Sequence, residues 1–200
     1  MSEIHFSNRI LKRFAETVAV ELGGDQFSAM LSLANLPADW VKPETFLKMD
    51  SETAAHAYSA LQTAMRTYFG RGARGVLLRV GKALWEDLLD DASLGVKAQA
   101  AVTRRLPQST RRKPTLELLA KLIGVHPGDI SVHTLDMDLI YVDHASASAH
   151  DQSESRPICF VTQGLIQESL YWATGKSYDV EEVHCKAQGE QNCEFKITGG

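Results

Sequence analysis

The chain has 200 residues, 44% hydrophobic and 23% charged, a balance that is typical of a folded chain with a buried core and excludes a disordered or collagen-like one. Its 21 basic and 25 acidic residues give a net charge of -4, so the overall charge does not favour nucleic acid or an anionic membrane as a partner. Because no apolar run approaches the roughly 18 residues that span a bilayer, and the amino end does not resemble a signal peptide, we expect a cytoplasmic protein.

The first 125 residues have the pattern of successive helices. Ser7 can cap a first segment whose apolar residues recur at three- and four-residue steps as far as Leu22, and Gly23 ends it. A shorter apolar stretch follows over 27–36. The same spacing, with glycine or proline at several ends, predicts further helices over 51–69, 75–91, 96–106 and 114–123.

The spacing of the apolar residues changes after residue 125, from a helical to an alternating pattern. Alternating residues between 129 and 143 predict two strands or one bent strand, and the Ser-, Ala- and His-rich loop that follows, 144–156, is expected at the surface. A helix over 158–173 comes next. Strands over 178–187 and 192–198, joined by a turn at 188–191, predict a β-hairpin at the carboxyl end.

This order of elements predicts an α+β fold. A helical amino-terminal part, 1–125, is expected to pack on an antiparallel sheet whose elements follow the order ββαββ within 126–200. We expect the whole chain, 1–200, to form a single domain.

Three cysteines lie in the last quarter of the chain, Cys159, Cys185 and Cys193. Seven residues centred on Gly189 separate the last two, so a hairpin that turns there places them on adjacent strands, close enough to share a metal ion. Cys159 would stand in the first turn of the preceding helix, where the helix dipole favours a thiolate. Three sulfur ligands favour zinc. The fourth ligand stays open at this point: His184, Glu181, Glu182 or another nearby group.

Two segments, 156–175 and 180–195, carry a family resemblance; they begin with Arg156-Pro-Ile-Cys and Val180-Glu-Glu-Val-His-Cys. They resemble the vinyl-4-reductase domain family, which includes the aromatic-sensing domains of phenol- and xylene-responsive transcription activators and proteins described as hydrocarbon-binding. The fold of that family is similar to that of TRAPP-type vesicle-tethering subunits. Its zinc motif, C-x22-E-x2-C-x7-C, falls here on Cys159, Glu182, Cys185 and Cys193. The resemblance implies a structural zinc ion that fastens the carboxy-terminal hairpin.

The spacing between Glu182 and Cys185 in the motif constrains the conformation of the backbone between them. Glu182 and Cys185 are three positions apart, and in a regular strand their side chains would face opposite sides. The motif therefore requires a bulge or the start of a strand near Val183. Without one, His184 is the next candidate ligand.

The resemblance also places a ligand pocket between the helices and the sheet. It implies a small-molecule sensor or carrier for an apolar or aromatic ligand, and dimers that pair through amino-terminal helices. Apolar faces on the first helix, such as Phe14 and Val18, likewise predict a homodimer. The residues expected to line the pocket are Met137, Tyr141, Phe160 and Gln163, with His133 as a polar contact.

Other patterns are less specific. Gly70-x-Gly72-x-x-Gly75 spells the dinucleotide fingerprint, but it follows a helical segment and so predicts a turn between helices. Five basic residues within 104–113 predict a solvated loop, with an anion, a nucleic acid or an acidic protein as the alternative contact. No catalytic triad, P-loop or carboxylate pair can be assembled, so an enzyme is less expected than a binding protein. Two other functions stay open: a tetrapyrrole-binding carrier or accessory protein of chlorophyll-type vinyl reduction, and an assembly subunit with a vestigial or lipid-filled pocket.

Overall fold

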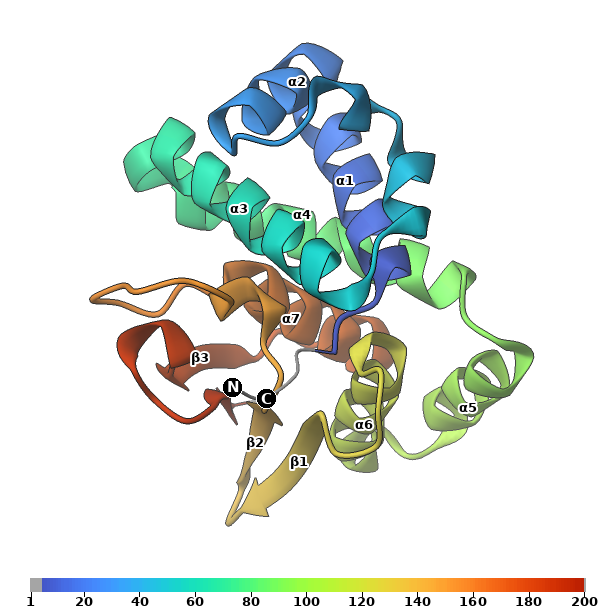
Figure 1. Cartoon of the computed structure of the whole chain (residues 1–200). Coiled ribbons are helices and arrows are strands. Elements are labelled where there is room, and N and C mark those ends of the chain that lie inside the picture. Colours follow the sequence, from blue (N-terminus) through green and yellow to red (C-terminus); the bar gives the residue numbers. More distant parts are fainter. Residues whose placement is uncertain (1–4, 200) are drawn as a thin grey trace.

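The computed structural model describes residues 5–199, in which helices cover a four-stranded sheet and one helix, α7, lies between the two (Figure 1). The helices are α1 (Asn8–Leu22), α2 (Gly24–Leu33), α3 (Ser51–Phe69), α4 (Ala73–Asp90), α5 (Leu94–Arg105), α6 (Arg112–Ile123) and α7 (Phe160–Thr174). The strands are β1 (Ile130–Leu135), β2 (Asp138–Asp143), β3 (Asp179–His184) and β4 (Cys193–Thr198).

The predicted α+β class and the ββαββ order are confirmed. All strand pairs are antiparallel, and the order across the sheet is β1-β2-β4-β3, so the two hairpins meet along β2 and β4. The predicted helices are present, and the largest difference in a boundary, three residues, is at α2. None of the helices in residues 5–199 is long and apolar enough to cross a membrane.

The sheet register contains the bulge that the zinc motif requires. Glu182 pairs with Phe195 and His184 pairs with Glu194, so Val183 has no partner of its own on β4. The extra residue turns the strand locally, and Glu182 and Cys185 consequently share the buried side while Val183 and His184 are exposed.

Most of the helix α7 is buried, which explains why apolar and small residues predominate in it. It crosses α4 where two glycines meet: a Cβ atom on Gly81 would come closer than 3.0 Å to the carbonyl oxygen of Val161, and one on Gly164 would clash with the carbonyl oxygen of Leu78. The two backbones are therefore in direct contact. This crossing fixes the position of the first turn of α7, which begins beside the cysteine cluster.

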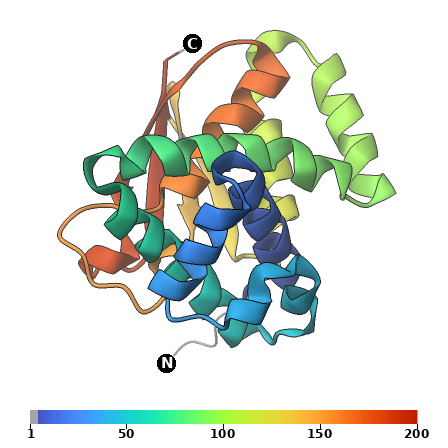
Figure 2. The ribbon, with the colours of Figure 1, turned by 90° about the horizontal axis from the view of Figure 1, so that it is seen from above.

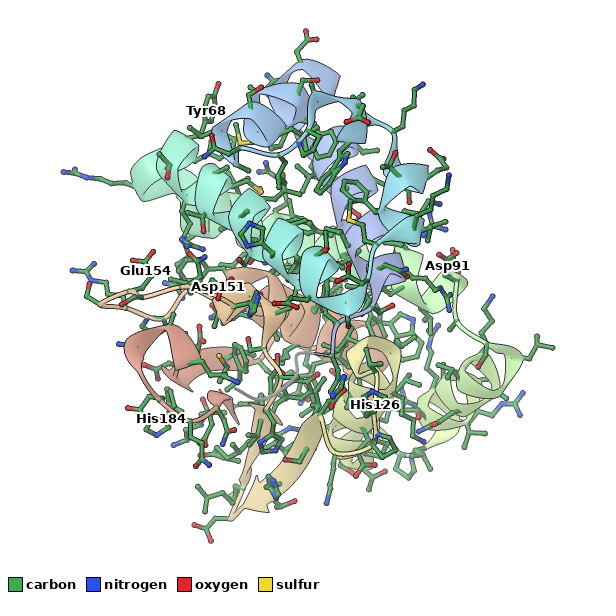
Figure 3. The ribbon with its side chains drawn as sticks, in the orientation of Figure 1. Tyr68, Asp91, His126, Asp151, Glu154 and His184 are labelled. Carbon is green, nitrogen blue, oxygen red and sulfur yellow. The ribbon has the colours of Figure 1, made fainter. Side chains whose placement is uncertain are left out.

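The loop 144–156 differs from its prediction, because its first part is packed instead of exposed. Ser146 to Ala149 are buried, and the Nε2 amide of Gln62 on α3 donates a 3.1 Å hydrogen bond to Ser148. The small Ser and Ala side chains let this segment approach α3 closely, and polar side chains of α3, Gln62 and Thr63, donate hydrogen bonds to the side chains of Ser148 and Gln152. His144 and the later part of the loop are exposed, and the later part, which carries Asp151 and Glu154, lies beside α3 (Figure 3).

The glycine pattern and the basic run both have structural roles. The chain turns from α3 into α4 through a 3-10 turn, Gly70–Gly72, as predicted, and no strand precedes it. In the basic run, Arg111 donates to the carbonyl of Ala173 at 2.8 Å, and the guanidinium of Arg112 lies 5.0 Å from the ring of Tyr178. These two arginines hold α6 against the end of α7 and the chain that enters β3, instead of lying in a solvated loop.

The apolar face of α1 is covered within the chain. Phe14 and Val18 are fully buried, and α1 contacts α2, α3 and α4. The argument that this face needs a second copy to cover it is therefore wrong. The helix that stands apart is α5, which projects from the side of the molecule in both ribbon views (Figures 1 and 2).

Candidate metal centre and adjoining groove

Four potential metal ligands meet where α7 approaches the β3–β4 hairpin. Cys159 is the residue immediately before α7, Glu182 lies on β3, Cys185 follows β3, and Cys193 begins β4. All four residues are buried, and their ligand atoms lie within 4.8 Å of one another. The four positions of the sequence motif are thus brought together.

The sulfur atoms have the spacing of ligands around one ion. The Sγ atom of Cys159 is 3.9 Å from that of Cys185 and 3.5 Å from that of Cys193, and the last two are 4.0 Å apart. A tetrahedron with zinc–sulfur bonds of about 2.3 Å has edges of about 3.8 Å, whereas a disulfide bond is about 2.05 Å long. The arrangement is that of a tetrahedral thiolate site.

The alternative fourth ligands are directed away from the cluster. Glu181 and His184 are exposed, and His184 instead approaches Glu190, with Nδ1 and Oε1 3.8 Å apart (Figure 3). Glu182 is 8% exposed; its Oε2 accepts a 2.9 Å hydrogen bond from the Cys159 amide, and its Oε1 is buried without a hydrogen-bond partner among the described residues. A buried carboxylate oxygen left without a donor fits coordination to a cation.

Electrostatics within the cluster also favour a cation. Hydrogen bonds from the Cys159 and Cys193 thiols lower the pKa of Cys185 to about 2, whereas the bonds to Cys185 and Cys193, together with burial, raise the pKa of Cys159 well above its usual range. Burial raises the pKa of Glu182 to about 8. One thiolate is stabilised and its neighbours hold their protons, so a divalent cation is needed to ionise all four ligands together.

Outer contacts orient the sulfur atoms. The backbone amide of Lys186 donates to Cys193 Sγ at 3.3 Å, and Ser146 Oγ lies 3.6 Å from Cys159 Sγ. Such contacts fix the direction of a thiolate and lower its charge density. The residues present therefore fit a divalent metal ion, and with four protein ligands the site resembles structural zinc sites.

A groove of about 690 Å³ lies next to the cluster, between the α3–α4 turn, the first turn of α7 and β3. Two residues expected to contact a ligand, Phe160 and Gln163, line it; Gln163 is buried and donates to the carbonyl of Val180. Glu182 belongs both to this lining and to the cluster. The other lining residues are Arg66, Gly70, Arg71, Ala73, Arg74, Arg156, Pro157, Asp179, Val180 and Glu181.

The structure does not bring the other three expected residues to this groove. Tyr141 is fully buried on β2, beside Phe195, and its hydroxyl has no partner among the described residues. His133 is exposed on the edge strand β1, and Met137 is 88% exposed in the β1–β2 turn. That hairpin extends beyond the helices at one end of the sheet, which corrects the expectation that His133 and Met137 line a pocket between layers (Figure 1).

The interior between helices and sheet is nearly filled. A cavity of about 40 Å³ remains, lined in part by Phe6, Tyr58, Ile130 and Leu165. An engineered cavity that binds benzene has about 150 Å³. This cavity is therefore too small for such a ligand, and the larger space is the groove beside α7 and β3.

The arginines of the groove were missed by sequence reasoning, which used only the glycines of the segment that contains Arg71 and Arg74. Arg66 precedes them by one short turn of the chain, whereas Arg156 is distant in the sequence and meets them only in the folded structure. The available signal was the alternation of glycine and arginine in Gly70-Arg-Gly-Ala-Arg-Gly, which is compatible with an exposed basic turn.

Comparison with known proteins supports the family and the fold. Residues 142–198 match the model of the vinyl-4-reductase domain, the family that the cysteine motif resembles. No match to a curated protein was found. An H-NOX protein from S. oneidensis in the Fe(II)NO ligation state is similar in structure, with a TM-score of 0.60 and 14% identity, over 96% of this chain and 98% of that chain.

Two further solved structures show similarity. An oxygen-binding H-NOX domain related to soluble guanylate cyclases has a TM-score of 0.53 and 14% identity, over 96% of this chain and 93% of that chain. The phenol-responsive sensory domain of the transcription activator PoxR with phenol has a TM-score of 0.49 and 13% identity, over 70% and 73%. At these identities the H-NOX likeness shows the fold.

Proposed function

We propose that this chain, whose residues 142–198 match the vinyl-4-reductase domain, is a small-molecule-binding module of the sensor or carrier type. The ligand occupies the groove beside the cluster, and a zinc ion bound by Cys159, Glu182, Cys185 and Cys193 holds the walls of that groove. The observation that carries the proposal is the shared wall: Glu182 lines the groove and belongs to the cluster, and Phe160 directly follows Cys159.

The groove has the dimensions and part of the lining of a ligand site. Its volume of about 690 Å³ lies within the range of roughly 300–1,000 Å³ that is usual for small-molecule pockets. Phe160 is half-buried in it, with Pro157, Ala73 and Val180 as further apolar lining. An aromatic or apolar portion of a ligand would pack on this surface.

Binding is a better fit than catalysis for the metal centre. Four protein ligands fill a tetrahedral coordination sphere, so no position is left for water or substrate. The role of the zinc ion is then to join the start of α7 to the β3–β4 hairpin. Because the first turn of α7 and β3 are two walls of the adjoining groove, this junction also fixes the shape of the groove.

A buried heme is less favoured as a ligand of this chain. Heme distortion has been studied in the H-NOX family, but none of the seven histidines here, all within the described residues, is buried. The three cysteines face one another in the cluster, and the remaining cavity between the helices and the sheet is only about 40 Å³. A buried heme would need both an iron ligand and a far larger cavity.

An assembly subunit is also less favoured. In residues 5–199 the most exposed large apolar side chains, Val20, Leu94 and Met137, stand on three separate elements instead of forming a patch. The whole chain is proposed as one domain, because α7 from the carboxy-terminal part packs closely on α4 from the helical part.

The homodimer remains a prediction. Cyclic dimers are the commonest assemblies of soluble proteins, although the face of α1 that first suggested one is covered within the chain. Light scattering at micromolar concentration should give about twice the 22.1 kDa of the chain. A particle of the mass of one chain would contradict the prediction.

The binding proposal is tested by thermal shift and titration calorimetry on the full, zinc-loaded chain, with phenols, aromatic hydrocarbons and fatty acids as probes. A ligand at a hundred times its Kd stabilises the folded state by about 2.7 kcal/mol. Replacing Phe160 by alanine removes the aromatic surface of the groove and should weaken binding about tenfold, which corresponds to about 1.4 kcal/mol.

The matched control is Tyr171→Ala. Tyr171 is on the same helix and 52% exposed, but it does not line this groove, so its removal should leave affinity unchanged. Equal losses for the two variants, or no shift in melting temperature with any probe, would argue against ligand binding at this site.

A further inference from the structure

Four arginines, from two segments of the chain, line the groove. Arg66 is on α3, Arg71 and Arg74 are in the turn to α4 and its first residues, and Arg156 precedes α7. Such a concentration of guanidinium groups is not explained by the net charge of the chain, which is -4. It is also not required by an apolar ligand.

Three of the four groove arginines have no ion-pair partner, in contrast to arginines elsewhere in the protein. Arg13 pairs with Asp91 and Glu16, and Arg79 pairs with Glu21. In residues 5–199, by contrast, Arg71, Arg74 and Arg156 form no ion pair, and the acidic lining residues on β3, Asp179 and Glu181, pair with none of the four arginines. The groove is therefore lined by three positively charged side chains that have no acidic partner.

Arg66 adds a fixed and incompletely satisfied donor. Its Nη2 bonds to Thr63 and Gln152, at 2.9 and 3.0 Å, and pairs with Glu154 at 3.3 Å, so the side chain, which is only 14% exposed, is held in place. Its Nη1 is buried and has no hydrogen-bond partner among the described residues. The guanidinium of Arg66 is thus held at the edge of the groove by neighbouring side chains.

Arg74 connects the charged and aromatic parts of the site. Its guanidinium carbon lies 6.0 Å from the ring centroid of Phe160, at the outer limit of a cation–π contact. A planar ligand ring seated on Phe160 would therefore be next to guanidinium groups. Planar guanidinium groups bind carboxylate and phosphate through two parallel hydrogen bonds.

We infer that the ligand of the groove is an aromatic oxyanion, a ring that carries a carboxylate or a phosphate group, with the ring on Phe160 and the oxyanion among Arg66, Arg71, Arg74 and Arg156. This inference rests on the proposed binding function and names the class of ligand. It replaces a purely apolar ligand by one with a charged end, because an apolar ligand would leave Arg71, Arg74 and Arg156 without an anionic partner.

Matched probes test the inference by titration calorimetry on the full, zinc-loaded chain. Benzoate and phenyl phosphate are compared with benzyl alcohol, which has a similar ring and no charge, and with inorganic phosphate, which has no ring. We expect at least one of the two aromatic anions to bind about ten times more tightly than benzyl alcohol and inorganic phosphate, with an affinity that falls as salt increases. The better of the two identifies the oxyanion.

The variants Arg71→Gln and Arg74→Gln should each weaken the binding of the aromatic anion about tenfold and leave benzyl alcohol unaffected. Arg79→Gln is the control, since Arg79 is on the same helix as Arg74 but outside the groove. If benzyl alcohol binds as well as the anions, and Phe160→Ala weakens all of them, the charged ligand is refuted and the binding function stands. If no probe binds, both proposals fail.

Discussion

Removal of the proposed zinc ion is expected to cause the largest loss of stability in this protein. Metal analysis of the purified chain should find about one zinc ion per chain, and chelation should lower the melting temperature and expose the β3–β4 hairpin to proteolysis. Apparent binding free energies of structural zinc in small peptides are about 10–16 kcal/mol, which is comparable with the whole stability of a typical domain, about 5–15 kcal/mol. The free energy of binding to a site that is absent from the unfolded chain adds directly to the free energy of folding.

The variant Cys185→Ala should reproduce the effect of the chelator. It removes the residue whose thiolate is the most stabilised and leaves two thiols and a carboxyl group buried without a cation. We expect loss of the bound metal and a fall in stability of several kcal/mol, measured by denaturant unfolding with and without chelator.

A matched control lies one residue away. His184 is exposed on the bulged end of β3, so His184→Ala should retain about one zinc ion per chain and the melting temperature of the parent. Loss of zinc in that variant would show that the ligand set is wrong. A Cys185–Cys193 disulfide in reduced, metal-loaded protein, or a Cys185→Ala variant whose stability is the same with and without chelator, would exclude the structural role.

The residues of the candidate metal centre could be predicted only in part from local spacing. The seven residues between Cys185 and Cys193 predicted that these two face each other across a hairpin, whereas Glu182 was singled out among the possible fourth ligands only by the family motif. That motif required a bulge or a strand start near Val183, and the sheet register contains the bulge. Helix periods located α1 to α6, because the repeat of 3.6 residues is visible before any tertiary contact is known.

Features that depend on contacts between distant segments, the lining of the groove among them, could not be predicted from local spacing. The buried loop at Ser146 to Ala149 is packed by side chains of α3, and nothing in its own polar composition indicates burial. Similarly, an alternating pattern places His133 on one face of a strand, but the pattern does not say that β1 is an edge strand beyond the helices. Arg156 becomes a neighbour of Arg66 and Arg74 only through the packing of α7 on α4.

The second large effect is expected at the crossing of α4 and α7. Replacing Gly81 by alanine would place a Cβ atom against the backbone of Val161, and replacing Gly164 would place one against Leu78 and Gly81. Backbone atoms cannot rotate away as a flexible side chain can, so the helices must separate. Overpacking of a well-packed core typically costs about 1–3 kcal/mol, and we expect each variant at the upper end, near 3 kcal/mol. For a chain of this size that corresponds to a fall in melting temperature of about 6–12 °C.

The same helix α4 provides the control, because a Cβ atom on Gly75 would meet nothing within 4 Å. Gly75→Ala should therefore leave the melting temperature unchanged or raise it, since alanine favours a helix over glycine by about 1 kcal/mol. The double variant Gly81→Ala/Gly164→Ala should destabilise the protein by less than the sum of the single variants, because the first substitution already separates the two backbones.

A shift of α7 should also change the proposed metal centre and the groove. Val161 is two residues after Cys159 and next to Phe160, so a displaced α7 moves a proposed zinc ligand and the aromatic wall of the groove together. Single variants as stable as Gly75→Ala would show that the helices do not touch at this crossing.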